Sequence, residues 1–213
     1  MVINVMLVDD HKMLREGIKQ LLEFDPEIKV ISSAQTGKEC LSLLEENKPD
    51  IVLLDINLPD ITGIKLIKEI KKRSKAIKVM MLTVHNEVEY LVDSLDGGAD
   101  GYILKDSGAD ELIKAIKFIY NGERYIEPSL IPSLNARLVQ LETETDMVKS
   151  LTKREIQILS LLVNGKSNLD ISETLKLSEQ TIKNHVTALY KKIGVKDRTQ
   201  AAVFAIRNNI VSM

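Results

Sequence analysis

The sequence is poor in the residues that build disulfide-linked, metal-bound or membrane-spanning proteins. Among its 213 residues Cys40 is the single cysteine, which excludes a disulfide framework and a cysteine-based zinc site. The histidines His11, His85 and His185 are too far apart for the short spacings of histidine metal sites. No run approaches the roughly 18–20 apolar residues of a membrane span, and the first residues lack the basic segment of a signal peptide. We therefore expect a cytoplasmic protein without a membrane partner.

Charge is divided unevenly along the chain, although its sum is close to zero. Lys and Arg number 29 and Asp and Glu number 31, which gives a net charge of -2. Residues 1–120 carry a balance of -5, residues 121–148 one of -3 and residues 149–213 one of +6. This division indicates different partners for the two ends, with a cation or a protein for the acidic end and nucleic acid for the basic end.

The first 120 residues alternate short apolar runs with longer amphipathic stretches. The runs are continuously hydrophobic, which is typical of strands buried on both faces of a parallel sheet. The pattern predicts a doubly wound α/β domain with a five-stranded parallel sheet. We expect the strand order 2-1-3-4-5, which is the order of flavodoxin-like sheets. The predicted strands are 3–8, 30–31, 51–54, 79–82 and 102–104, and the predicted helices lie near 11–24, 37–47, 63–73, 87–97 and 108–121.

Polar residues follow four of these strands. Because the carboxyl ends of parallel strands meet at one edge of the sheet, we expect them to converge there. Three carboxylates about 4 Å apart repel one another by roughly 4 kcal/mol per pair at an effective dielectric of 20, so they call for Mg²⁺ or an ammonium group. A single acidic residue after a strand is more often a cap of the strand end or of the next helix. Polar residues after four of the strands favour a phosphoryl-binding site instead. The residues are Asp9, Asp10, Asp55, Asn57, Thr83 and Lys105.

These motifs resemble the receiver domain of two-component response regulators over about residues 1–121. They are Asp9-Asp10, the run 50–55, Asn57-Leu58-Pro59, Thr83 and the run 102–105. The resemblance implies that Asp55 is the phosphoacceptor and that a histidine kinase is the phosphoryl donor. It also implies Mg²⁺ as the cofactor, held by Asp9, Asp10, the Asp55 side chain and the Asn57 main-chain carbonyl.

The same resemblance implies roles for three residues around the phosphoryl group. Thr83 and Lys105 would contact its oxygens, and Tyr102 would turn inward when Thr83 moves. One departure concerns the residue after the lysine, where many receivers have proline in a cis peptide. Here Asp106 follows Lys105, and a cis bond before a residue other than proline costs about 2.5–4 kcal/mol, so the bond is either trans or strained.

Residues 122–148 show a looser pattern. Pro128 and Pro132 bracket a helix start, and leucines at 134, 138 and 141 indicate a weak helix. The stretch 142–146 is acidic and polar. We predict an extra helix and a linker here, between a first domain over 1–121 and a last domain over 149–213.

The last 65 residues predict a small helical domain with well-marked helix starts. Thr152 with Glu155 and Ser167 with Asp170 have the spacing of capping boxes, and Ser178 caps a longer third helix. Two short helices joined by a tight turn, the second longer, indicate a helix-turn-helix.

The outer face of that third helix carries donors for DNA. We expect Lys183 and Asn184 at base edges, and the flanking Thr181, Lys191 and Lys192 at phosphates. Thr187 lies on the same face, between Lys183 and Lys191. A solvated charged face is the plainer interpretation of such a helix, but the balance of +6 in this domain favours DNA.

Residues 149–210 resemble the LuxR-type helix-turn-helix domain. The resemblance is carried by residues 151–155, 162–168, 177–186 and 197–201. It implies four helices, with 178–193 in the DNA groove and 198–208 available for dimer contact. Joined to the receiver-like part, it places the chain in the NarL/FixJ class of response regulators, where it is most similar to DegU-type members.

The sequence therefore predicts a DNA-binding transcription regulator that is switched by phosphorylation and is not a classical enzyme. Phosphorylation would favour a homodimer whose third helices meet adjacent half-sites of a double-stranded operator, and RNA polymerase is a further candidate partner. Two alternatives stay open. One is a phosphorelay or scaffold protein whose basic domain binds a partner protein. The other, less favoured, is a magnesium-dependent phosphohydrolase that uses the same aspartates.

Overall fold

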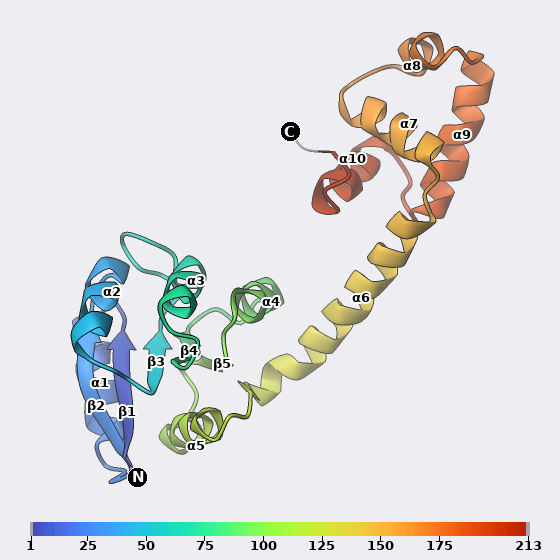
Figure 1. Cartoon of the computed structure of the whole chain (residues 1–213). Helices are drawn as coiled ribbons and strands as arrows, with labels where there is room; N and C mark the ends of the chain where they lie inside the picture. Colours follow the sequence, from blue (N-terminus) through green and yellow to red (C-terminus); the bar gives the residue numbers. More distant parts are fainter. Residues whose placement is uncertain (1, 212–213) are drawn as a thin grey trace. The chain divides into compact units, whose positions relative to one another are not determined.

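The computed structural model describes residues 2–211, which form two compact units that divide between Asn135 and Ala136 (Figure 1). The N-terminal unit is a layered α/β structure and the C-terminal unit is helical. Each unit has its own hydrophobic core. Across the described residues no helix combines the length and the apolar character that crossing a membrane requires.

The N-terminal unit is built on a parallel sheet of order β2-β1-β3-β4-β5-β6. Its strands are β1 (Ile3–Val8), β2 (Ile28–Ala34), β3 (Ile51–Leu54), β4 (Lys78–Thr83), β5 (Gly101–Leu104) and β6 (Tyr125–Ile126). The predicted fold class and the order of the first five strands are confirmed. The sixth strand was not predicted, because its two residues are recognisable as a strand only from their pairing with β5. The second strand, predicted over 30–31, is longer than predicted.

Helices cover both faces of this sheet. They are α1 (Lys12–Leu22), α2 (Gly37–Glu46), α3 (Gly63–Arg73), α4 (Val88–Gly97) and α5 (Ala109–Tyr120). One core cluster joins a face of the sheet to α1 and α5, and a second joins the other face to α2, α3 and α4. All four residues of β3 are at most 1% exposed, which explains why its apolar run is continuous.

A single long helix occupies most of the segment for which a helix and a linker were predicted. After the turn η1 (Pro128–Leu130), α6 runs from Ile131 to Ser150 and continues through the acidic stretch 142–146. Pro132 lies in the first turn, where a missing N–H is tolerated, and neither proline nor glycine follows it within the helix. The helix therefore has no internal residue that would end it.

The C-terminal unit contains α7 (Lys153–Val163), α8 (Asn168–Leu175), α9 (Glu179–Lys192) and α10 (Arg198–Arg207). Both predicted capping boxes are present: the Thr152 hydroxyl accepts from the Glu155 N–H at 3.2 Å, and Ser167 and Asp170 repeat the arrangement. The turn between α8 and α9 passes through Lys176 in the left-handed region, with φ 53°. Two short helices joined by this turn form a helix-turn-helix.

Asp100 is a half-buried carboxylate that ties α3, β4 and β5 together. It accepts hydrogen bonds from the Lys71 ammonium at 2.6 Å and from the Val79 N–H at 2.9 Å, and the Lys78 ammonium lies 3.3 Å away. Burial alone would raise the pKa of Asp100, but these hydrogen bonds outweigh it and hold the pKa below its ordinary value. The ionised form is therefore the one that stabilises the fold.

We predict a pH-dependent loss of stability that depends on this carboxylate. Its contribution is complete above the unfolded pKa of about 3.9 and is lost as the pH falls through the lower folded value. Asp100→Asn should lower the free energy of unfolding by about 1–3 kcal/mol near neutral pH, and by less below pH 4. Urea unfolding of both proteins between pH 3 and 7 measures this. The exposed control Asp93→Asn should change little, and an equal loss for Asp100→Asn at every pH would contradict the assignment.

Candidate functional site

The register of the sheet brings the residues after β1 and β3 together at one edge. Val8 pairs with Leu54, and Asp55, the residue after β3, donates its backbone N–H to the Val8 carbonyl at 2.8 Å. At the same edge of the sheet, β4 and β5 are joined by a hydrogen bond in which the Lys105 N–H donates to the Thr83 carbonyl at 2.8 Å. Carboxylate oxygens of Asp9, Asp10 and Asp55 and a ring nitrogen of His11 lie within 4.8 Å of one another.

The ammonium group of Lys105 bridges two buried carboxylates. Its Nζ lies 2.6 Å from Asp9 Oδ2 and 2.8 Å from Asp55 Oδ2. Asp9 and Asp55 are only 4% and 3% exposed, so these contacts are shielded from water. Burial alone would lower the pKa of Lys105, but its hydrogen bonds to Asp55 and Asp9 outweigh burial and raise the pKa above its ordinary value. Lys105 therefore stays charged.

The carboxylate cluster offers oxygen ligands for a cation. Asp55 Oδ1 accepts from the Ile56 N–H at 2.8 Å, and Asp9 Oδ1 accepts from the His11 N–H at 2.8 Å. The Oδ2 atoms of both aspartates face the Lys105 ammonium. One ammonium offsets only one of three carboxylates, so the cluster keeps negative charge. Hard oxygen donors that lie within 4.8 Å of one another and keep negative charge fit Mg²⁺.

Asp10 and His11 form the exposed rim of the cluster. The Asp10 side chain is 40% exposed and that of His11 is 69% exposed, and His11 Nδ1 lies 2.7 Å from Asp10 Oδ1. His11 was not among the predicted site residues. Its place directly after the acid pair was the available signal, whereas its distance from the other histidines is unlike that of a histidine metal site.

His85, a second residue absent from the prediction, connects three predicted site residues. Its N–H donates to the hydroxyl of the buried Thr83 at 3.2 Å, and its carbonyl accepts from the Tyr102 hydroxyl at 2.8 Å. Its ring Nε2 lies 3.0 Å from Asn57 Nδ2. Tyr102 is fully buried in the inward orientation, and burial raises the pKa of its hydroxyl. The loop after β4 therefore joins the threonine, the tyrosine and the loop after β3.

The loop that carries Asn57 is held tightly. The Gly63 N–H donates to the Ile56 carbonyl at 2.8 Å, and a Cβ at Gly63 would lie 2.1 Å from the Asp55 carbonyl oxygen, so no side chain fits there. Asp60 caps α2 from the same loop, because its two oxygens accept from the backbone N–H groups of residues 37 and 38, each at 2.9 Å. These contacts fix the chain beside Asp55. The Lys105–Asp106 bond is trans, like every other described peptide bond.

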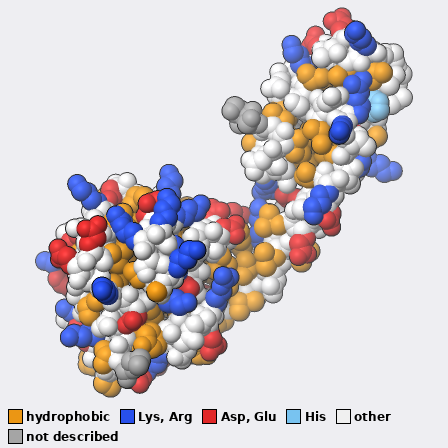
Figure 2. All heavy atoms as spheres, viewed as in Figure 1, with side chains coloured by type: hydrophobic (Ala, Val, Ile, Leu, Met, Phe, Trp, Pro, Cys, Tyr) orange, Lys and Arg blue, Asp and Glu red, His pale blue; other side chains and the backbone are white. Residues whose placement is uncertain are grey.

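The predicted DNA-facing residues lie on α9 and differ in their exposure and in the ion pairs that they form. Lys183, Asn184, Thr187 and Lys191 are exposed, whereas Thr181 and Lys192 are half-buried. Lys183 pairs with Glu179 one turn earlier at 2.9 Å, an exchangeable surface contact. Lys192 instead donates to Glu155 of α7 at 2.8 Å, which lowers the pKa of that carboxyl. Figure 2 shows Lys and Arg side chains (blue) on the part of the C-terminal unit that contains α9.

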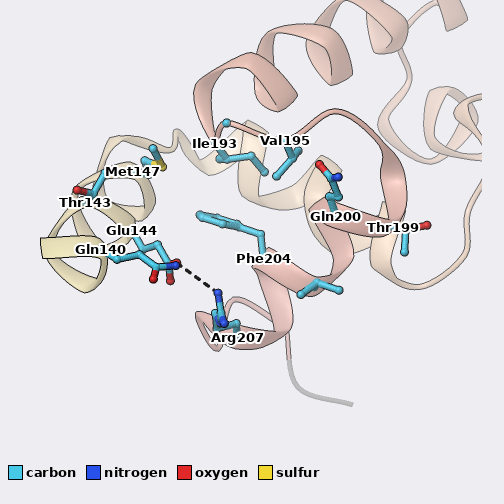
Figure 3. A pocket seen from close by; sticks show the side chains of 12 residues that line it. Gln140, Thr143, Glu144, Met147, Ile193, Val195, Thr199, Gln200, Phe204 and Arg207 are labelled. Atoms are coloured by element: carbon cyan, nitrogen blue, oxygen red, sulfur yellow. Dashed lines mark hydrogen bonds and ion pairs between the residues drawn. The ribbon is translucent and has the colours of Figure 1, made fainter. Parts of the chain in front are cut away.

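A separate cavity of about 500 Å³ lies within the C-terminal unit, between the last turns of α6, the turn after α9, and α10. Figure 3 shows Phe204 projecting toward the α6 residues, with Ile193 and Val195 beside it. An ion pair of 3.4 Å joins Arg207 to Glu144 at its edge. Val203, also on its wall, is 57% exposed, so α10 presents apolar surface.

Comparisons with known proteins agree with both halves of this description. Residues 5–117 match the family described as the response regulator receiver domain, and residues 149–205 match the bacterial regulatory proteins of the luxR family. The transcriptional regulatory protein DegU of Brevibacillus brevis is 35% identical over 99% of this chain and 96% of its own length. The response regulator protein VraR of Staphylococcus epidermidis is 36% identical over 99% of this chain and its full length.

A solved structure that is similar to this chain belongs to the same family. The two-component response regulator of the LuxR family from Aurantimonas sp. SI85-9A1 is 32% identical, with a TM-score of 0.63, and the match covers 65% of this chain and 99% of that one. The predicted resemblance is thereby confirmed. The chain belongs to the response regulator family and joins a receiver domain to a LuxR-type DNA-binding domain, as transcription regulators of that family do.

Proposed function

We propose that Asp55 accepts a phosphoryl group from a histidine kinase and that the resulting aspartyl phosphate controls DNA binding by residues 149–213. The observation that carries the proposal is the Lys105 ammonium, on a side chain that is 9% exposed, between the buried Asp9 and Asp55 at 2.6 and 2.8 Å. A phosphoryl group on Asp55 would bring its own negative charge beside this ammonium. We propose that residues 1–121 are the receiver domain and that residues 122–148 connect it to the DNA-binding domain.

The transfer needs alignment and charge neutralisation more than covalent machinery. A carboxylate oxygen of Asp55 attacks the phosphorus of a phosphohistidine, the P–N bond breaks, and the imidazole leaves with the electron pair and takes up a proton. Asp9, Asp10, Asp55 and the Asn57 carbonyl would hold Mg²⁺, which neutralises phosphoryl charge when bound. Lys105 keeps its positive charge throughout and stabilises the transferred oxygens.

The contacts of His85 provide a route by which phosphorylation of Asp55 alters residues farther from the site. If the Thr83 hydroxyl turns to donate to a phosphoryl oxygen, it changes its contact with the His85 N–H, which is 3.2 Å long. The His85 carbonyl holds the Tyr102 hydroxyl at 2.8 Å, so a shift of this loop is felt at Tyr102. The surface formed by β4, α4 and β5 would then change shape on phosphorylation.

DNA recognition follows from the exposed face of α9. We propose that Lys183 and Asn184 reach base edges in the major groove, that Thr187 lies against the same groove, and that Thr181 and Lys191 meet phosphates. Lys192, predicted to meet phosphate as well, would do so only by leaving Glu155. The apolar surface of α10 supports a homodimer on adjacent half-sites of an operator in the cytoplasm, where RNA polymerase would respond to it.

Phosphorylation of the chain should depend on Asp55. Incubation with acetyl phosphate and Mg²⁺ should add one phosphoryl group to the wild-type chain, and Asp55→Asn should abolish the addition because the attacking oxygen is gone. Intact-protein mass spectrometry measures both. Asp106→Asn, an exposed acid beside Lys105, is the matched control and should be modified like wild type. Unchanged modification of Asp55→Asn would overturn the assignment.

Substitutions on α9 should weaken DNA binding in two distinguishable ways. Lys191→Ala should weaken binding to all sequences alike and reduce the salt slope by about 0.9, the share of one phosphate contact. Asn184→Ala should instead reduce discrimination between operator and unrelated DNA by roughly 1–3 kcal/mol. Fluorescence anisotropy at several salt concentrations measures both effects. Lys75→Ala, an exposed lysine of the receiver, is the control for lost charge. If Lys75→Ala weakened binding as much as Lys191→Ala, the basic domain would lose its assigned role.

A further inference from the structure

The middle of α6 carries leucines that pack against neither core. Leu134 belongs to the core of the N-terminal unit, and Met147 and Val148 pack on that of the C-terminal unit. Leu138 is 45% exposed and Leu141 is half-buried, and among the described residues neither belongs to a core cluster. Figure 2 shows hydrophobic side chains (orange) at the surface of the segment that Figure 1 labels α6. The helix is held at both ends, with an apolar stripe between them.

The stripe has the spacing of a coiled coil. Successive intervals of three and four residues place its members on one side of the helix, at the a and d positions of a heptad. Ile131, Leu134, Leu138, Leu141, Thr145 and Val148 have this spacing. Leu134 and Val148 pack on the two cores, so the stripe that lies between the cores consists of Leu138, Leu141 and Thr145. The cavity at the end of α6 is lined by Gln140, Thr143, Glu144 and Met147, which lie on a different side of the helix. Leu138, Leu141 and Thr145 therefore lie on a different side of α6 from the residues that line the cavity.

Charges flank the stripe in a self-complementary order. In this register Arg137 occupies position g and Glu142 position e, five residues later, and Glu144 and Lys149 repeat the relation. When two such helices pair in parallel, each g position faces the e position five residues on in the other helix. Arg137 would face Glu142 of a second copy, and Glu144 would face Lys149. Both contacts join opposite charges.

Three of these charged residues form no ion pair within residues 2–211: Arg137, Glu142 and Lys149. Glu142 and Lys149 are exposed. Arg137 Nη1 is buried without a hydrogen-bond partner, so Arg137 gains a partner when its side chain turns outward to a second copy. Glu144 is already engaged, at 3.4 Å from Arg207. The pair of Arg137 with Glu142 of the second copy is therefore the new electrostatic contact.

We propose that a second copy of this chain packs its α6 in parallel against this stripe, with Leu138 and Leu141 opposite their counterparts. The pairing rests on the proposed function and deepens it, because it adds α6 to α10 as a surface of the homodimer proposed there. A second copy is favoured over another protein because the charge order complements itself in register. Parallel pairing has a two-fold axis along the helices, which presents two α9 helices to DNA symmetrically.

Cysteine cross-linking of the full chain tests the pairing and its direction. The native Cys40 is fully buried and burial raises the pKa of its thiol to about 12, so it should not interfere. Leu138→Cys and Thr145→Cys each place a thiol on the stripe and leave Leu141 in place. Val139→Cys, at a residue that is 63% exposed, is the matched control on another side of the helix. Each variant is oxidised with and without acetyl phosphate and Mg²⁺, then run on non-reducing gels.

We expect covalent dimers from the variants at 138 and 145, in at least one of the two conditions, and at least fivefold less from the variant at 139. Linking at both stripe positions requires parallel helices, because an antiparallel pair cannot bring both residues opposite their counterparts. No linking at 138 and 145 in either condition, linking at only one of them, or equal linking at 139 would overturn the proposal.

Charge exchange gives an independent test that needs no new thiol. Arg137→Glu should weaken dimerisation roughly tenfold, since two like-charge contacts replace two favourable ones, and adding Glu142→Arg should restore it. Light scattering over a concentration series measures the dimer. Weakening without restoration would contradict the pairing. If the wild-type chain dimerises but neither stripe thiol forms a link, the α6 pairing is contradicted and the proposed function is not. If the stripe thiols form links but the chain does not bind DNA, the proposed function is contradicted and the α6 pairing is not.

Discussion

The bridge from Lys105 to Asp9 and Asp55 is the interaction on which the receiver site depends. Two carboxylates that are at most 4% exposed would be costly side by side without a countercharge. Lys105 supplies it at 2.6 and 2.8 Å and keeps its proton, because its hydrogen bonds outweigh burial. The bridge leaves the third carboxylate unbalanced, so the site still attracts a cation. Assembly and reactivity therefore come from the same contacts.

Backbone register makes this bridge available. The strand order puts β1 beside β3 and β4 beside β5, so residues separated by as many as 96 positions meet at one edge. Tight packing fixes the neighbouring loop, since Gly63 touches the backbone of Asp55. His85 then links Thr83 to Tyr102 through its own backbone. A change of charge at Asp55 thus has a short path to the surface beside β5.

The sequence predicted what depends on periodicity and on residues at strand ends. It gave the sheet order, both capping boxes and the convergence of the aspartates with Lys105, because each follows from local pattern and parallel topology. It missed what depends on tertiary contact: His85 acts largely through its backbone, which carries no residue signature, and β6 is recognisable as a strand only from its pairing with β5. Lys191 and Lys192 are identical in sequence terms, and only the Glu155 contact distinguishes them. The linker was predicted from acidic composition, yet a helix without internal glycine tolerates that composition.

One measurement tests the central role of the bridge: the Mg²⁺ affinity and the phosphorylation of Lys105→Met, compared with wild type by calorimetric titration and intact mass. Removing the ammonium leaves three carboxylates without a countercharge, so Mg²⁺ should bind severalfold more tightly. Phosphoryl transfer to Asp55 should nevertheless be strongly reduced, because the group that stabilises the transferred oxygens is missing. A variant that bound Mg²⁺ more weakly, or that accepted the phosphoryl group as wild type does, would contradict the account.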